Sequence, residues 1–158
     1  MIYLENDESV DAAGGSARWG YLYYSANRDA ARAYSLEQGK VRQATDLGFD
    51  FPAPPLATEW IDSDRAYEKA ENVGGRKYRE KHAGRLRSML LMRGAFHDDE
   101  PDRTTWTLVY DSPSAPSLWI VIDAMRADGQ FSRFSRGGDR SRQRERLSPG
   151  HEDRRLPL

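Results

Sequence analysis

The sequence has no cysteine among its 158 residues, which excludes disulfide bridges, thiol catalysis and zinc sites built on cysteine. No apolar run approaches the length of a membrane span. The first residues have neither a basic flank nor an apolar stretch, so no signal peptide is expected. Glycine motifs for phosphates or dinucleotides are missing too, because Gly14-Gly15, Gly74-Gly75 and Gly137-Gly138 are isolated pairs. No motif of a disulfide scaffold, membrane protein or nucleotide enzyme is therefore present.

Charge is nearly balanced overall but unevenly distributed. The chain has 24 Lys and Arg residues against 25 Asp and Glu residues. From Ser132 onward eight arginines face four acids, so that segment carries +4 and the body before it carries −5. An acidic body is a poor surface for phosphates, so nucleic acid is not expected as a partner. Residues 132–158 contain few apolar groups, and this composition predicts a disordered, arginine-rich tail.

Alternating aromatic residues and short apolar runs predict a sheet of about six strands. The predicted strands are residues 1–4, 17–25, 31–36, 88–96, 104–112 and 118–122. One main helix is predicted to begin at Asp62 or Ser63, which can cap its first turn, and to stop at Gly74-Gly75. Residues 76–82 are charged and are left open as another turn or two of helix. The fold class is therefore α+β, with an antiparallel sheet and one helix packed on a face.

The most informative pattern is an internal repeat, W-x-x-x-Y-x-S, at residues 19–25 and 106–112. Each copy is followed by a turn, another strand and a closing glycine, Gly39 or Gly129. The four residues Trp19, Tyr23, Trp106 and Tyr110 are expected to occupy the same core position twice. The predicted organisation is a first repeat of strands only at 1–45, a proline-rich linker at 46–59, a second repeat at 60–131 and the tail at 132–158.

Four segments of the second repeat carry a resemblance to the PepSY-like family. They are Trp60–Ala66, Ala70–Gly75, Thr105–Tyr110 and Leu118–Ala124. The family unit is a helix followed by an antiparallel sheet of three or so strands, and its usual Asp-Ala-x-Thr-Gly ending is replaced here by Met125–Gly129. The resemblance implies a non-catalytic protein-binding or regulatory module that is periplasmic or secreted. Its partner would be a peptidase or another envelope component, and the module would inhibit it by occupying a cleft of the partner or by extending a sheet edge.

The first repeat begins without a helix, so one part of the sheet is expected to lack its cover. Either the domain begins upstream of this sequence or a partner fills the gap, and self-association through the uncovered sheet is a further option. Tyr24 and Tyr34 are the candidate interaction surface, because aromatic residues dominate binding hot spots. The alternative function is a small enzyme or ligand-binding protein that uses the concave face of the sheet.

Candidate catalytic and metal-binding residues are weak. His97–Glu100 with Asp102 resembles a metal cluster, but its spacing lacks the glycine of a calcium loop and it is interpreted as a solvated hairpin loop. Asp62 and Asp64 are explained by capping and by the helix dipole, and Glu68 by an ordinary helix surface. The sequence contains no nucleophile elbow. No catalytic residue, metal ligand or cofactor site is therefore predicted.

Overall fold

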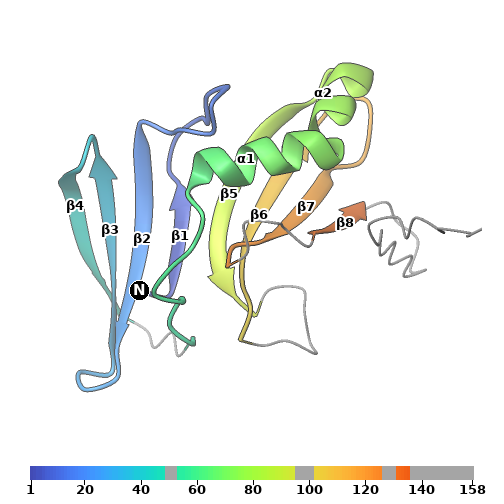
Figure 1. Ribbon diagram of the computed structural model, residues 1–158. Helices are drawn as coiled ribbons and strands as arrows, with labels where there is room; N and C mark the ends of the chain where they lie inside the picture. The colour runs from blue at the N-terminus through green and yellow to red at the C-terminus, as the bar shows by residue number, and fades with distance from the viewer. Residues whose placement is uncertain (49–52, 95–101, 126–130, 136–158) are drawn as a thin grey trace, which may run out of the picture.

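The computed structural model describes residues 1–48, 53–94, 102–125 and 131–135, the last range by its backbone alone. It has an α+β fold with one antiparallel sheet and one helical segment (Figure 1). The strands are β1 (Tyr3–Asn6), β2 (Arg18–Ser25), β3 (Ala30–Glu37), β4 (Lys40–Leu47), β5 (Arg85–Arg93), β6 (Thr104–Asp111), β7 (Leu118–Asp123) and β8 (Phe131–Ser135). The helical segment comprises α1 (Ser63–Ala70), a π-helical turn η1 (Glu71–Gly75) and α2 (Arg76–His82).

The strand order is β4-β3-β2-β1-β5-β6-β7-β8, so the first strand of the chain lies in the middle of the sheet. We call β1–β4 the first meander and β5–β8 the second meander, and they join where β1 pairs antiparallel with β5. The prediction of about six strands is too low. Seven strands lie within residues 3–123, and β8 pairs with the outer edge of β7.

The helical segment begins where the sequence predicts. Asp62 is its N-cap, and the Asp62 carboxylate accepts a hydrogen bond from the backbone N–H of Ser63. The backbone is non-helical at Gly74, where the segment kinks, but helix resumes in α2 and ends at Ala83 in the left-handed conformation. The predicted stop at Gly74-Gly75 is therefore a kink, and residues 76–82 are the further helix that the sequence left open. Gly75 serves a different purpose: a Cβ atom at this position would lie 2.5 Å from the hydroxyl oxygen of Tyr110. Glycine therefore lets the helix approach the sheet closely.

The core lies between this helix and one face of the sheet. Ala66 and Ala70 of α1 are fully buried, and their small side chains bring the helix close to the strands. Trp106 is 1% exposed, and its indole N–H donates a hydrogen bond to the carbonyl of Ile61, which ties the start of the helix to β6. The sheet side of the core consists of Leu4, Met89, Leu91, Trp106, Leu108, Tyr110, Leu118, Ile120 and Ile122.

Some predictions fall on parts of the chain that the structure does not describe. His97–Glu100 and Gly129 lie outside the described residues, as does the predicted tail from residue 136 onward. The predicted linker at 46–59 begins too early, because β4 extends to Leu47. Its described part is anchored near β1, where the N–H of Leu56 donates to the carbonyl of Met1.

Candidate functional site

The two faces of the sheet differ in what covers them. Successive side chains of a strand point to opposite faces, so Leu4 of β1 shares the core face with its cross-strand partners Tyr21 and Leu91. The helix lies on this core face, over the second meander (Figure 1). In the part of the chain that the structure describes, no helix lies over β2, β3 or β4. Trp19 and Tyr21 of β2 still pack against the edge of the core, so the core face of the first meander is open mainly over β3 and β4.

Matching registers relate the two meanders. Glu5 of β1 pairs with Leu90 of β5 at the junction. One residue further along each strand, Asn6 pairs with Trp19 and Leu91 pairs with Trp106. Trp19 and Trp106 thus occupy corresponding places on either side of the junction, on the same face of the sheet. Their rings meet edge to face, with 6.0 Å between centroids.

Aromatic and apolar side chains gather on the open part of the core face. Tyr21 lies directly opposite Tyr34, and the Tyr34 ring packs edge to face against Tyr23 with centroids 5.6 Å apart. Tyr23 is 43% exposed and Val41 is 58% exposed. We call this surface the open aromatic face; it consists of Tyr21, Tyr23, Tyr34, Leu36 and Val41.

Charged groups lie among these rings. Arg32 is the cross-strand partner of Tyr23, and its guanidinium carbon lies 5.5 Å from the centroid of the Tyr34 ring. The Arg32 Nε also forms an ion pair with the Asp46 carboxylate at 3.2 Å. Burial raises the pKa of Tyr21, with smaller effects from nearby Tyr23 and Asp62. The surface thus combines aromatic rings with one guanidinium–carboxylate pair that lies among them.

Two sequence predictions about individual tyrosines need correction. Tyr110 is fully buried, but Tyr23 is 43% exposed, so the two corresponding tyrosines do not seal the same core position. The reason is that only Tyr110 has the helix above it. Tyr24 and Tyr34 do not form one surface either, because Tyr24 alternates with Tyr23 and so points to the opposite face. There its hydroxyl donates a hydrogen bond to the Asp29 carboxylate at 2.6 Å.

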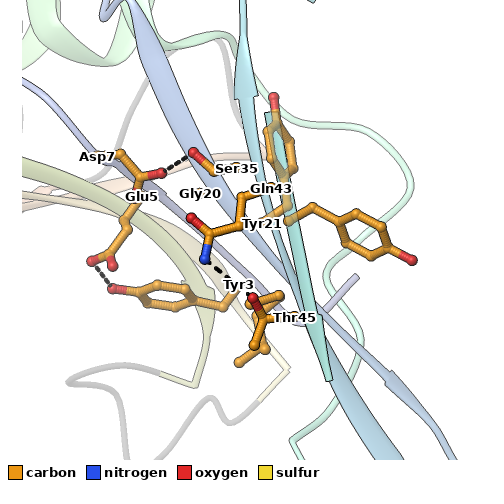
Figure 2. A pocket seen from close by; sticks show the side chains of 11 residues that line it. Tyr3, Glu5, Asp7, Gly20, Tyr21, Ser35, Gln43 and Thr45 are labelled. Atoms are coloured by element: carbon orange, nitrogen blue, oxygen red, sulfur yellow. Dashed lines mark hydrogen bonds between the residues drawn. The ribbon is translucent and has the colours of Figure 1, made fainter. Parts of the chain in front are cut away.

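A polar hollow of about 320 Å³ lies on the opposite face of the first meander, away from the helix. Figure 2 shows Tyr3, Glu5 and Asp7 of β1 beside Ser35 of β3 and the pair Gln43 and Thr45 of β4. Gly20 of β2 forms part of the floor of the hollow, and a Cβ atom there would lie 2.7 Å from an Asp7 carboxylate oxygen. The lack of a side chain at Gly20 therefore lets Asp7 lie across β2.

Hydrogen bonds already engage both carboxylates of this hollow. The Tyr3 hydroxyl donates to Glu5 at 2.5 Å, and the Ser35 hydroxyl donates to Asp7 at 2.6 Å (Figure 2). Burial raises the pKa of Tyr3 well above its usual value, and the hydrogen bond to Glu5 raises it further. A tyrosine held protonated in this way is a hydrogen-bond donor and a poor base. The hollow therefore offers hydrogen-bonding groups without an activated nucleophile.

A second polar group lies under the helix. Glu71 is 6% exposed, and its carboxylate accepts hydrogen bonds from the Tyr110 hydroxyl at 3.0 Å and from the Arg79 guanidinium. Burial raises the pKa of Tyr110, and the charge of Glu71 adds to that effect. A buried carboxylate with both a cation and a hydroxyl as partners is a satisfied structural group. It fastens the helix to the second meander.

The remaining candidates from the sequence have structural roles or no cluster around them. The hydroxyls of Ser112 and Ser114 donate to the backbone carbonyl of His82 and so cap the end of the helix. Asp64 and Glu68 lie exposed on α1, where Glu68 forms an ion pair with Arg65. Among the described residues, no group of three or more acidic or histidine side chains could hold a metal ion. No helix in that part of the chain is long and apolar enough to cross a membrane.

Comparisons with protein-family models, with curated proteins and with solved structures found no match to this chain. The site therefore has to be interpreted from its own geometry.

Sequence reasoning missed most members of both surfaces. Tyr21, Leu36 and Val41 belong to the open aromatic face although only Tyr34 was singled out. Val41 could have been noticed as an apolar residue in an otherwise polar segment. Glu5 and Asp7 alternate along β1 and therefore share a face, but nothing in the sequence signals that β3 and β4 complete their hollow.

Proposed function

We propose that this protein is a non-catalytic, PepSY-like binding or regulatory module built from two related units, and that it binds another protein through the open aromatic face. The exposure of Tyr23 and Val41 on an otherwise core-facing surface carries the proposal. Large aromatic side chains are the commonest anchors of protein interfaces. Modulation of an envelope or secreted peptidase remains the partner class that the family resemblance suggests.

The register of the sheet supports the interpretation as two units. Trp19 and Trp106 have corresponding neighbours on either side of the β1–β5 junction, and four residues later stand Tyr23 and Tyr110. This spacing is the repeated W-x-x-x-Y pattern of the sequence. Each unit contributes a four-stranded meander to one continuous sheet. The first repeat thus includes β1, the strand that pairs with β5 of the second meander.

A site-directed crosslinking experiment tests the proposal. A photoreactive phenylalanine analogue placed at position 23 in cells is expected to capture a partner protein, whereas the same analogue at position 24 points to the other face and should not. The captured partner, once purified, is expected to bind the full chain at least tenfold more weakly when Tyr34→Ala removes a central ring. Equal capture from both positions, or an affinity unchanged by Tyr34→Ala, contradicts the proposal.

The polar hollow favours the second candidate, a ligand-binding protein. Its volume lies at the lower end of the range of small-molecule sites, and its lining offers carboxylate, hydroxyl and amide groups. Asp7→Ala separates the two functions, because Asp7 lies in the hollow and away from the open aromatic face. Binding that is lost with Asp7→Ala but kept with Tyr34→Ala would move the site to the hollow.

A further inference from the structure

Hydrogen-bond acceptors predominate in the polar hollow of the first meander, because its donors are largely used within it. The hydroxyl of Tyr3 donates to Glu5 at 2.5 Å, and the hydroxyl of Ser35 donates to Asp7 at 2.6 Å. The side-chain amide N–H of Gln43 donates to a neighbouring threonine hydroxyl at 3.3 Å, so its carbonyl oxygen is a further acceptor. Both carboxylates keep lone pairs for additional bonds. A ligand that matches these groups therefore donates several hydrogen bonds.

The charges of Glu5 and Asp7 are not balanced by a cation of the sheet. Among the described residues, neither carboxylate forms an ion pair. The carbonyl of Arg18 accepts the backbone N–H of Asp7, but its guanidinium pairs with Glu8 at 3.4 Å and lies 4.0 Å from Glu37. Glu5 and Asp7 alternate along β1 and so lie about 7 Å apart on one face. Two like charges at this spacing favour a cation that bonds both.

The lining of the hollow indicates the shape of that cation. Leu22 and Ala33 are its aliphatic residues, and they lie in one cross-strand row with Tyr3 of β1 and Thr45 of β4. Figure 2 shows the ring of Tyr3 beside the carboxylate of Glu5. A guanidinium has five N–H donors in one plane, stacks on aromatic rings and is more weakly hydrated than an ammonium group. The volume of about 320 Å³ suits such a group on a short aliphatic stem.

We propose that the hollow binds an alkylguanidinium group, with Glu5 and Asp7 as its acceptors and Leu22 and Ala33 against its stem. The group belongs either to a free small molecule or to an arginine side chain of a peptide, which share this chemistry. The inference rests on the hollow as a ligand site, the second candidate function. It is independent of the open aromatic face, because the hollow lies on the opposite face of the sheet.

An NMR titration of the full chain with butylguanidinium tests the proposal, and butylurea is its uncharged control of the same shape. Butylguanidinium is expected to shift the backbone amides of Glu5, Asp7 and Gly20, and to bind about fivefold or more tightly than butylurea. N-acetyl-arginine methylamide distinguishes the two sources. Tighter binding than that of butylguanidinium would indicate an arginine of a peptide, and weaker binding would indicate a free small molecule.

Matched variants make the test specific to the hollow. Glu5→Gln and Asp7→Asn should each weaken butylguanidinium binding about fivefold or more, whereas Glu68→Gln removes the same charge from α1 and should leave the affinity unchanged. Gly20→Ala should also weaken binding, because its methyl group would lie 2.7 Å from an Asp7 carboxylate oxygen and displace that side chain.

Three results would overturn the inference. They are equal binding of butylguanidinium and butylurea, an affinity that Asp7→Asn does not change, and amide shifts as large at Glu68 as in the hollow. The first of these is measured on the parent chain and so does not depend on the folding of any variant. The proposed binding of a protein through the open aromatic face survives all three, because crosslinking from position 23 tests it separately. Tyr23→Ala should leave butylguanidinium binding unchanged.

Discussion

The two meanders share strand order and register but differ in what lies above them. In the second meander the helix buries Trp106, Tyr110 and Ile120 to 1% exposure or less. In the first meander the corresponding tyrosine is nearly half exposed, and β4 has no buried residue. The second meander is therefore a complete two-layer unit, whereas the first packs against the core through β1 and β2 and leaves β3 and β4 as a single layer. The comparison suggests that stability resides in one half of the molecule and recognition in the other.

The largest effect on stability is expected from replacing the two tryptophans, Trp106 and Trp19. Trp106→Ala removes a fully buried ring and its hydrogen bond to Ile61, and is expected to lower the free energy of unfolding by about 3–5 kcal/mol. Trp19→Ala removes a partly buried ring at the corresponding place and should cost at least about 1 kcal/mol less. Urea denaturation of both variants measures the difference. Equal losses of unfolding free energy in the two variants would mean that both halves of the molecule contribute equally to stability.

A smaller effect is expected where the helix touches β6. Gly75→Ala places a methyl group 2.5 Å from the Tyr110 hydroxyl and 2.8 Å from a Glu71 carboxylate oxygen, and should cost about 1–3 kcal/mol. Gly48→Ala is the matched control in the first half, because no atom lies within 4 Å of a Cβ there. Thermal and chemical denaturation should leave that control unchanged or slightly stabilised. If Gly75→Ala left the stability unchanged, the helix would be able to move away from the sheet without loss of stability.

The smallest change expected is that of Tyr110→Phe, which removes one hydrogen bond to Glu71. About 1–1.5 kcal/mol of stability should be lost at neutral pH. Burial and Glu71 raise the pKa of Tyr110 above 10.0, so folded and unfolded chains both keep the phenol protonated below pH 10. Above pH 10 the unfolded chain loses this proton first, and stability falls with rising pH by up to about 1.4 kcal/mol per unit for each such tyrosine.

The pH dependence of stability isolates the contribution of Tyr110. Tyr110→Phe should make the decline above pH 10 shallower, while Tyr3, whose pKa is also raised, continues to contribute. Denaturation midpoints of the variant and the parent chain from pH 8 to 11.5 give the two slopes. Identical slopes for the two proteins would contradict the assignment of this titration to Tyr110.

Much of the fold was accessible from the sequence because local patterns encode it. Trp106, Leu108 and Tyr110 alternate, and the structure places all three in the core. The capping role of Asp62 was predicted from its position before an apolar stripe. The strand β4 was missed because all its residues but Leu47 are exposed, and an edge strand with little burial has no apolar alternation to detect.

The errors came from tertiary contacts that no local pattern reports. Gly74-Gly75 has the composition of a helix stop, but Gly75 is required by the approach of Tyr110, a residue 35 positions away. Tyr23 and Tyr110 have the same position in the W-x-x-x-Y-x-S repeat, and their burial differs because a helix covers one and not the other. Which face of the first meander stays open is therefore decided by packing between distant segments.

The central place of β1 also bears on how the chain assembles during synthesis. β1 can form its hairpin with β2 early, but its other edge pairs with β5, whose last residue is Arg93. Until that residue leaves the ribosome, the nascent first meander has an unpaired inner edge that can bind other strands. Closing this long loop is a slow, non-local step, so the rate of folding should depend on β1 meeting β5 more than on any hairpin.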